Sequence, residues 1–180
     1  IFYLILGLFF GFLSVLWVKL FYWIEDFYDK SRIFPYFRLA VGGLVTGVTG
    51  FMFIEYGILG PGYEGINLVL LGKIGLVTLV ILGTLKMIAT ANTVGSGGSG
   101  GIFSPSLFIG AMYGGALGLI FHSLFPGIIN EPFTYALVGM GALFAAAAHA
   151  PLTMIIMIPE MTQDYSLLLP MMIACSTSYI

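Results

Sequence analysis

The sequence predicts an all-α membrane protein, built as a bundle of partly broken transmembrane helices. Hydrophobic residues make up 59% of the 180 residues and charged residues only 8%, whereas a soluble domain carries about 25% charged residues. The apolar residues form long runs, and a glycine-rich stretch separates two of these runs. The net charge of -2 gives no support for a nucleic-acid partner.

The first half of the chain predicts three membrane spans. Residues 1–24, 36–54 and 75–92 are apolar, and the first of these is long enough to cross the roughly 30 Å hydrocarbon core. A polar loop is expected at 25–38 and a mixed, glycine-rich loop at 55–74. The loop at 25–38 holds three of the six basic residues, so the positive-inside rule places it in the cytoplasm.

The second half predicts shorter and more broken segments. The expected helices cover residues 104–125, 133–148, 151–159 and 165–180, with a turn at 126–132 and Asp164 capping the last run. The segments 133–148 and 151–159 are shorter than the roughly 20 residues that a plain span needs. Such pieces are expected where half-helices meet inside a membrane. The apolar surroundings of both chain ends predict that the sequence is a piece of something longer.

Small residues predict two close contacts between helices. Gly43 and Gly47 form a G-x-x-x-G pattern, which is typical of a helix-packing face. The segment 104–125 carries a second set, expected to pack closely on another helix: Gly110, Ala111, Gly114, Gly115, Ala116 and Gly118.

The glycine-rich stretch at 95–106 predicts an anion site. Five of its first seven residues are Gly, so few side chains keep a ligand away from the backbone N–H groups. Ser104 is expected to be the N-cap of the next helix and Pro105 its first residue. Free N–H groups and the positive end of a helix together favour an anion. Transporters build ion sites from broken helices in this way.

Other interpretations of the glycines are weaker. Gly95-x-Gly97-x-x-Gly100 matches the dinucleotide fingerprint, but an apolar helix precedes it and the next acidic residue is Glu131. A flexible linker would not lie between two membrane spans. The lone Cys175 excludes a disulfide within the chain and gives no support for a metal site. We therefore expect no cofactor, no metal and no enzymatic activity.

Several ordered motifs resemble one family of membrane proteins. The sequence Gly101-Ile102-Phe103-Ser104-Pro105 is similar to the G-x-F-x-P motif of the CLC chloride channels and chloride/proton antiporters. The preceding G-S-G-G-S-G-G resembles bacterial members. Further matches follow at Ala150-Pro151-Leu152-Thr153, Glu160-Met161-Thr162 and Leu169-Pro170-Met171. The resemblance covers nearly the whole chain, as the second half of the CLC membrane domain.

The resemblance implies a fold and a site. Residues 1–180 would be the C-terminal half of a CLC-type bundle, one half of an inverted repeat that pairs with an N-terminal half of the same chain. The backbone amides of Ile102 and Phe103 would bind chloride, Gly101 would allow the ion to approach, and Ser104-Pro105 would fix the helix start. The resemblance also implies a homodimer through 151–158 and 166–180, in the cell membrane of a prokaryote.

Three functions remain open at this point. The first is chloride transport, by a channel or by a chloride/proton antiporter, since the family's proton-handling acids lie outside these residues. The second is secondary transport of another anionic solute at the same kind of helix end. The third is a membrane fragment without transport activity. Lys86 lies inside a predicted span, where it either tunes the potential at the anion site, snorkels, or pairs with a carboxylate.

Overall fold

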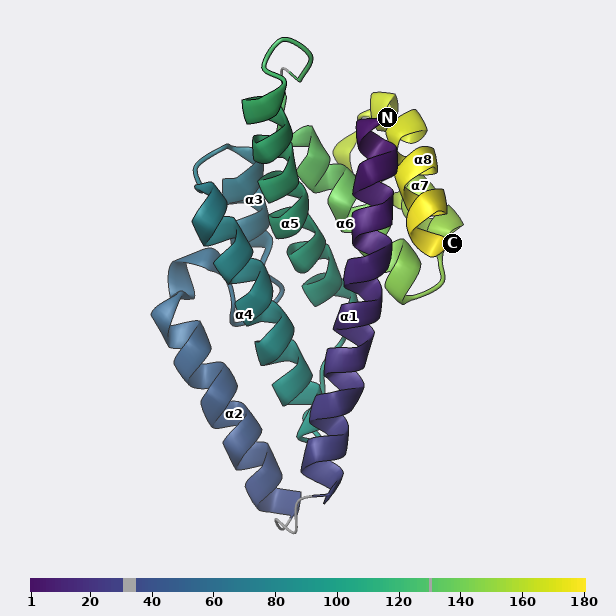
Figure 1. The fold of residues 1–180 in the computed structure, drawn as a ribbon. Coiled ribbons are helices and arrows are strands. Elements are labelled where there is room, and N and C mark those ends of the chain that lie inside the picture. Colours follow the sequence, from purple (N-terminus) through teal and green to yellow (C-terminus); the bar gives the residue numbers. More distant parts are fainter. Residues whose placement is uncertain (31–34, 130) are drawn as a thin grey trace.

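The structure is a computed structural model that describes residues 1–30, 35–129 and 131–180, and these residues form helices and connecting turns without any strand (Figure 1). The all-α prediction is thus confirmed for the described part of the chain. The elements are α1 (Phe2–Lys30), α2 (Pro35–Met52), a 3-10 turn η1 (Ile54–Tyr56), α3 (Tyr63–Leu70), α4 (Leu76–Gly95), α5 (Phe103–Leu124), α6 (Thr134–Ala147), α7 (Pro151–Thr162), a 3-10 turn η2 (Tyr165–Leu167) and α8 (Leu168–Tyr179).

Helix α1 continues through much of the predicted polar loop. Its 29 residues correspond to about 44 Å of helix, which is longer than the hydrocarbon core. The loop predicted at 25–38 is wrong for residues 25–30, because no Gly or Pro interrupts the helix there and Asp26 pairs with Lys30 one turn later, at 2.9 Å. Residues 31–34 lie outside the described residues. The charged end of the helix therefore extends past the apolar span.

Helix α2 forms where the second span is predicted but counts among the shorter apolar helices, and its predicted packing face has no neighbour in the described chain. An added Cβ at Gly43 or Gly47 would meet no atom within 4 Å, so these glycines face away from the rest of the described chain. The side that packs on α4 carries Gly42 and Thr46 instead. A Cβ at Gly42 would collide with Ser96, and the Thr46 hydroxyl donates to the carbonyl of Ala89 at 3.2 Å. The contact therefore uses a small-x-x-x-small pair one position earlier.

The loop predicted at 55–74 contains the short helix α3. Gly62 precedes it with a φ of 85°, a left-handed conformation that favours glycine. Ile66 and Val69 are buried at the i, i+3 spacing of a helix face. The loop prediction is wrong for residues 63–70, because most glycines of the segment occupy the turns on either side of α3 and only Gly65 lies within it.

Helices α5 and α6 form the close-packed centre, side by side in Figure 1. A Cβ at Gly110 would lie 2.7 Å from the Cα of Met140, and one at Gly114 would lie 3.0 Å from the Cα of Ala136. On the facing side, a Cβ at Gly139 would lie 2.9 Å from the Cα of Gly114. The predicted small-residue contact on α5 is confirmed, and it lets the two backbones touch.

The last two helices differ from the sequence prediction in their bounds. Pro159 lies inside α7, which runs on to Thr162 and ends at Gln163 in a left-handed conformation. Asp164 accepts the N–H of Ser166 at 3.0 Å and so caps the 3-10 turn that leads into α8. Helix α8 packs against α1 and α6.

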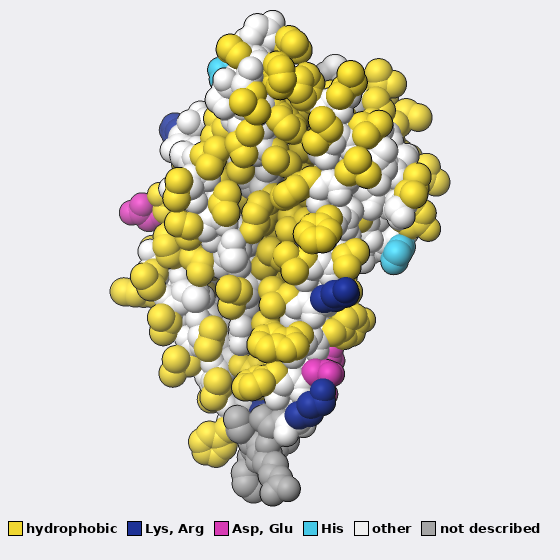
Figure 2. Space-filling model, viewed as in Figure 1, with side chains coloured by type: hydrophobic (Ala, Val, Ile, Leu, Met, Phe, Trp, Pro, Cys, Tyr) yellow, Lys and Arg dark blue, Asp and Glu magenta, His cyan; other side chains and the backbone are white. Residues whose placement is uncertain are grey.

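Within the described ranges, three helices are long and apolar enough to cross a membrane: α1, α4 and α5. Much of the face in Figure 2 is covered by apolar side chains, and charged groups on it are few. Phe12 on α1 and Leu44 on α2 are among the exposed apolar side chains of the described chain. Contact with lipid or with other protein explains such a surface, whereas water does not.

Candidate functional site

The helical structure is interrupted between α4 and α5, and defined hydrogen bonds end α4. Gly97, with a φ of 94°, follows the last turn of α4, and its N–H donates to the carbonyl of Val94 at 2.9 Å. The N–H of Gly98 donates to the carbonyl of Thr93 at 2.9 Å. These two bonds form a Schellman motif, which ends a helix and turns the chain away from its axis.

After this motif the backbone amides are free over one short stretch. Within the described part of the chain, no group accepts a hydrogen bond from the N–H groups of residues 99–104. The next backbone bond comes from the N–H of Ser106 to the carbonyl of Ile102, at 3.1 Å. The first turn of α5 adds its partial positive charge at the same place. This stretch is a ready site for an anion.

The start of α5 differs from the predicted one. The helix begins at Phe103, with Ile102 at the N-cap position, so Ser104 and Pro105 are its second and third residues. The prediction of Ser104 as N-cap is wrong because the carbonyl of Ile102 already accepts the first helical bond. The Ser104 hydroxyl instead donates to the carbonyl of Pro61 at 2.6 Å. Pro105 still occupies the first turn, where its missing N–H removes no helical bond.

The structure brings the predicted site residues together. Gly101 has open space beside it, since an added Cβ would meet no atom within 4 Å. Ile102 is 44% exposed, so its side chain and the adjacent amides are reachable from outside these residues. Phe103 is half-buried, and its ring packs edge-on against Phe144 of α6 with 4.9 Å between the centroids. One side of the site is thus fixed by packing while the other is open.

A cavity of about 530 Å³ adjoins this stretch. It lies between α2, α4, the turn before α3 and the start of α5, and its lining includes Gly101, Phe103 and Ser104. Thr46 and Thr93 also line it, and their hydroxyls lie 2.8 Å apart. Among the described residues that line it, none carries a carboxylate. The wall that these described residues form therefore carries hydroxyl groups and no acidic side chain that would repel an anion.

Lys86 also lines this cavity but is only 2% exposed. Its ammonium donates to the carbonyls of Ile58 at 2.8 Å, Gly60 at 2.7 Å and Gly57 at 3.3 Å. No Asp or Glu among the described residues forms an ion pair with it. Lys86 therefore neither snorkels nor pairs with a carboxylate, because three backbone carbonyls satisfy the buried charge.

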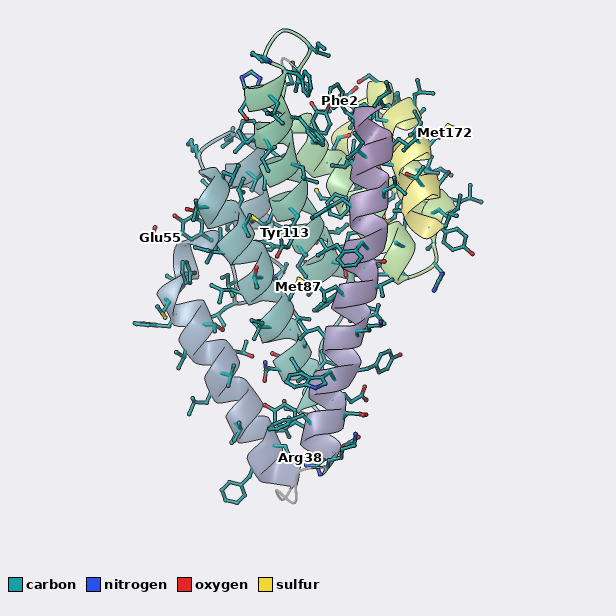
Figure 3. The ribbon with its side chains drawn as sticks, in the orientation of Figure 1. Phe2, Arg38, Glu55, Met87, Tyr113 and Met172 are labelled. Atoms are coloured by element: carbon teal, nitrogen blue, oxygen red, sulfur yellow. The ribbon has the colours of Figure 1, made fainter. Side chains whose placement is uncertain are left out.

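Sequence reasoning missed these partners of Lys86. The available signal was the cluster of turn residues at 57–62, because such turns bend carbonyl groups out of helical hydrogen bonding. Tyr113 on α5 forms a simpler link to α4. It lies against α4 and α1 (Figure 3), with its hydroxyl 2.8 Å from that of Thr84 and its ring 6.2 Å from that of Phe9.

The remaining polar residues form local contacts. His122 lies 2.6 Å from the carbonyl of Ile129, and Glu160 accepts a hydrogen bond from Tyr165 at 2.9 Å. The Tyr165 hydroxyl is at the surface, and its hydrogen bond to Glu160 raises the pKa of Tyr165. Over the described ranges, no group of three or more His, Cys, Asp or Glu is arranged to hold a metal ion.

The whole chain, residues 1–180, matches the family model described as voltage gated chloride channel. The chain belongs to this family. It is accordingly a multi-pass integral membrane protein, in agreement with its three long apolar helices.

Relatives within the family come from bacteria. The chain is 41% identical over 178 residues to a protein of Ralstonia nicotianae provisionally named a ClcB-like chloride channel protein, covering 99% of this chain and 41% of that relative. It is 37% identical over 175 residues to the H+/Cl- exchange transporter ClcA of Yersinia pestis, covering 96% of this chain and 37% of the relative. The chain thus spans about two fifths of the length of these relatives.

A solved structure has the same fold. The chain superposes on a slow cyanobacterial Cl-/H+ antiporter with a TM-score of 0.87 at 31% sequence identity. The match covers 98% of this chain and 41% of the antiporter chain. The prediction of a CLC-type helix bundle is confirmed.

Proposed function

We propose that the chain is the second half of a membrane domain that transports chloride, with the ion bound by the backbone amides of Ile102 and Phe103. The main support for this proposal is the run of free N–H groups at residues 99–104, which leads directly into the first turn of α5. Partial charges of backbone amides suit transport, because an ion has to leave the site as readily as it enters. Gly101 gives the ion room to approach, and the first turn of α5, with Ser104 and Pro105, holds the amides in place.

An N-terminal half of the same protein would complete the site. Ile102 is exposed and Gly101 faces open space in these residues, so the other side of the ion would be supplied from outside them. The names of the relatives point to chloride and protons, so another anionic solute is not favoured. The same names, a channel and exchange transporters, support a transport function. That this transport needs no resident cofactor and no enzymatic step is part of the proposal. The bacterial relatives support a prokaryotic cell membrane.

We also propose that the complete protein is a homodimer through α7 and α8. Large apolar side chains on these helices are exposed, among them Leu152, Ile156, Leu169 and Met172. Each would lose contact with water or lipid when a second copy covers the face. Crosslinking across α8 in the membrane would yield a dimer, and a monomer at all protein concentrations would contradict this part of the proposal.

The test uses the full-length protein in liposomes loaded with chloride, with chloride efflux and external pH recorded together. Chloride efflux coupled to proton entry identifies an exchanger, and efflux without proton movement identifies a channel. Gly101→Leu should weaken halide binding and slow flux, because the new side chain fills the space in front of the amides. Gly127→Leu is the matched control, since Gly127 also faces open space but lies beyond the far end of α5. Unchanged halide affinity in Gly101→Leu would contradict binding of the ion by these amides.

A further inference from the structure

The ammonium of Lys86 has no proton left for an anion. Its three N–H groups donate to three carbonyls of residues 57–60, two of them at 2.8 Å or less. The negative ends of these carbonyl dipoles point at the ammonium and offset much of its field. A direct contact of Lys86 with a transported ion would require breaking one of these bonds. Its position beside the cavity therefore needs another explanation.

The segment of residues 57–61, here the 57–61 loop, is held at two points. Lys86 on α4 holds its first part, and the Ser104 hydroxyl on α5 holds its end through the carbonyl of Pro61. Ser104 is the second residue of α5, directly after Phe103. The loop is therefore a bridge between the middle of α4 and the first turn of α5.

The ring of Phe108 packs on the inner side of Lys86 and of the turn that leads into α3. Its ring is fully buried on the second turn of α5, and the Lys86 Nζ lies 5.1 Å from its centroid. A Cβ at Gly65 would lie 2.6 Å from the same ring, and one at Gly62 would collide with it. Lys86, the 57–61 loop and α5 thus restrain one another, with no room for the loop to shift inward.

From this arrangement we infer that Lys86 is a positioning residue for the anion site. Through the 57–61 loop and Ser104, it fixes the first turn of α5 and so the direction of the amides of Ile102 and Phe103. The inference rests on the proposed function of those amides. It differs from an electrostatic role of Lys86, because it predicts that the neutral Ser104 hydroxyl acts in the same way as the charged side chain.

The experiment measures chloride binding to the purified full-length protein by titration calorimetry, together with its thermal unfolding. Lys86→Met and Ser104→Ala are each expected to weaken chloride binding, by roughly tenfold for Lys86→Met, which is the lower end of the loss found when residues that orient the ligands of a metal site are changed. The chloride affinity of the double variant should be no lower than that of whichever single variant binds chloride more weakly, because both changes release the same loop. The matched control is Tyr113→Phe, which removes a hydroxyl link between α4 and α5 away from the loop.

The outcomes separate the possible explanations. Weaker binding in both single variants, without additivity and with Tyr113→Phe unchanged, supports the positioning role. Weaker binding in Lys86→Met alone overturns it in favour of a charge effect, and unchanged affinity in both variants overturns it outright. Where Lys86→Met does not fold, Ser104→Ala decides, since it removes one hydroxyl at the edge of the cavity. If the unsubstituted protein does not bind chloride, the proposed function itself is contradicted.

Discussion

The ring of Phe103 packs edge-on against Phe144, with 4.9 Å between the two centroids and an angle of 82° between the planes. This contact joins the start of α5 to α6, so the residue that carries one of the proposed chloride amides is held by its own side chain. An edge-to-face pair contributes about 1 kcal/mol beyond its buried area. The amide of Phe103 is therefore oriented both by the helix and by this pair.

Phe144→Ala is expected to weaken chloride binding several-fold, because Phe103 loses the ring against which it packs. The measurement is chloride titration of the full-length protein, with thermal unfolding recorded alongside. Phe125→Ala serves as the control, since Phe125 packs on Phe2 just beyond the far end of α5, at 5.5 Å between centroids. Equal losses of affinity in both variants would mean that general loosening of the bundle, not the position of Phe103, explains the effect.

Much of the helical framework could be predicted from the sequence, because apolar runs and glycine clusters are local signals. The break before Ile102 and the small-residue face of α5 were both predicted in this way. The N-cap of α5 lies two residues before the predicted one, since a Ser-Pro pair is typical of an N-cap and first position. Here the Ser104 hydroxyl has a partner 43 residues earlier in the chain, the carbonyl of Pro61. Such a distant acceptor leaves no local trace.

The partners of Lys86 could not be predicted for the same reason. The direction of the carbonyls at 57–60 depends on the left-handed glycines of that turn, and Gly57 and Gly60 have φ values of 68° and 107°. A pattern of apolar and polar residues does not record which way a carbonyl points. The G-x-x-x-G of α2 meets no other helix of the described chain, and the contact with α4 uses Gly42 and Thr46 instead, because the sequence shows that a small-residue stripe exists but not what lies opposite it.

Gly114→Ala is expected to destabilise the protein by about 1–3 kcal/mol, the usual cost of overpacking. The new methyl group would collide with the carbonyl of Tyr135 and lie 3.0 Å from the Cα of Ala136, and backbone atoms cannot move aside as a flexible side chain does. Thermal unfolding in detergent measures the change. Gly127→Ala is the control with open space around the glycine, and a similar loss there would argue against close packing as the cause.

The hydrogen bond from Tyr165 to Glu160 predicts a dependence of stability on high pH. This bond raises the pKa of Tyr165 above its value of about 10 in an unfolded chain. The folded state therefore holds the phenol proton more tightly, and its contribution is complete below about pH 10 and is lost as the pH rises through the raised pKa. The stability advantage over Tyr165→Phe should shrink as the pH rises above about 10. A constant difference across that range would contradict the role of the bond.

Gly97→Ala is expected to affect both stability and the anion site. Gly97 has a φ of 94°, and a Cβ in that region costs about 1 kcal/mol or more. The strain falls on the Schellman motif that ends α4, so the chain would leave the helix at another angle and residues 99–101 would shift. We expect a loss of about 1–2 kcal/mol in unfolding free energy and weaker chloride binding. Gly75→Ala, at the other end of α4, is the control, because its φ of -76° and the open space around it accept a side chain. Full chloride affinity in Gly97→Ala despite its lower stability would show that the amides of Ile102 and Phe103 are held by α5 alone.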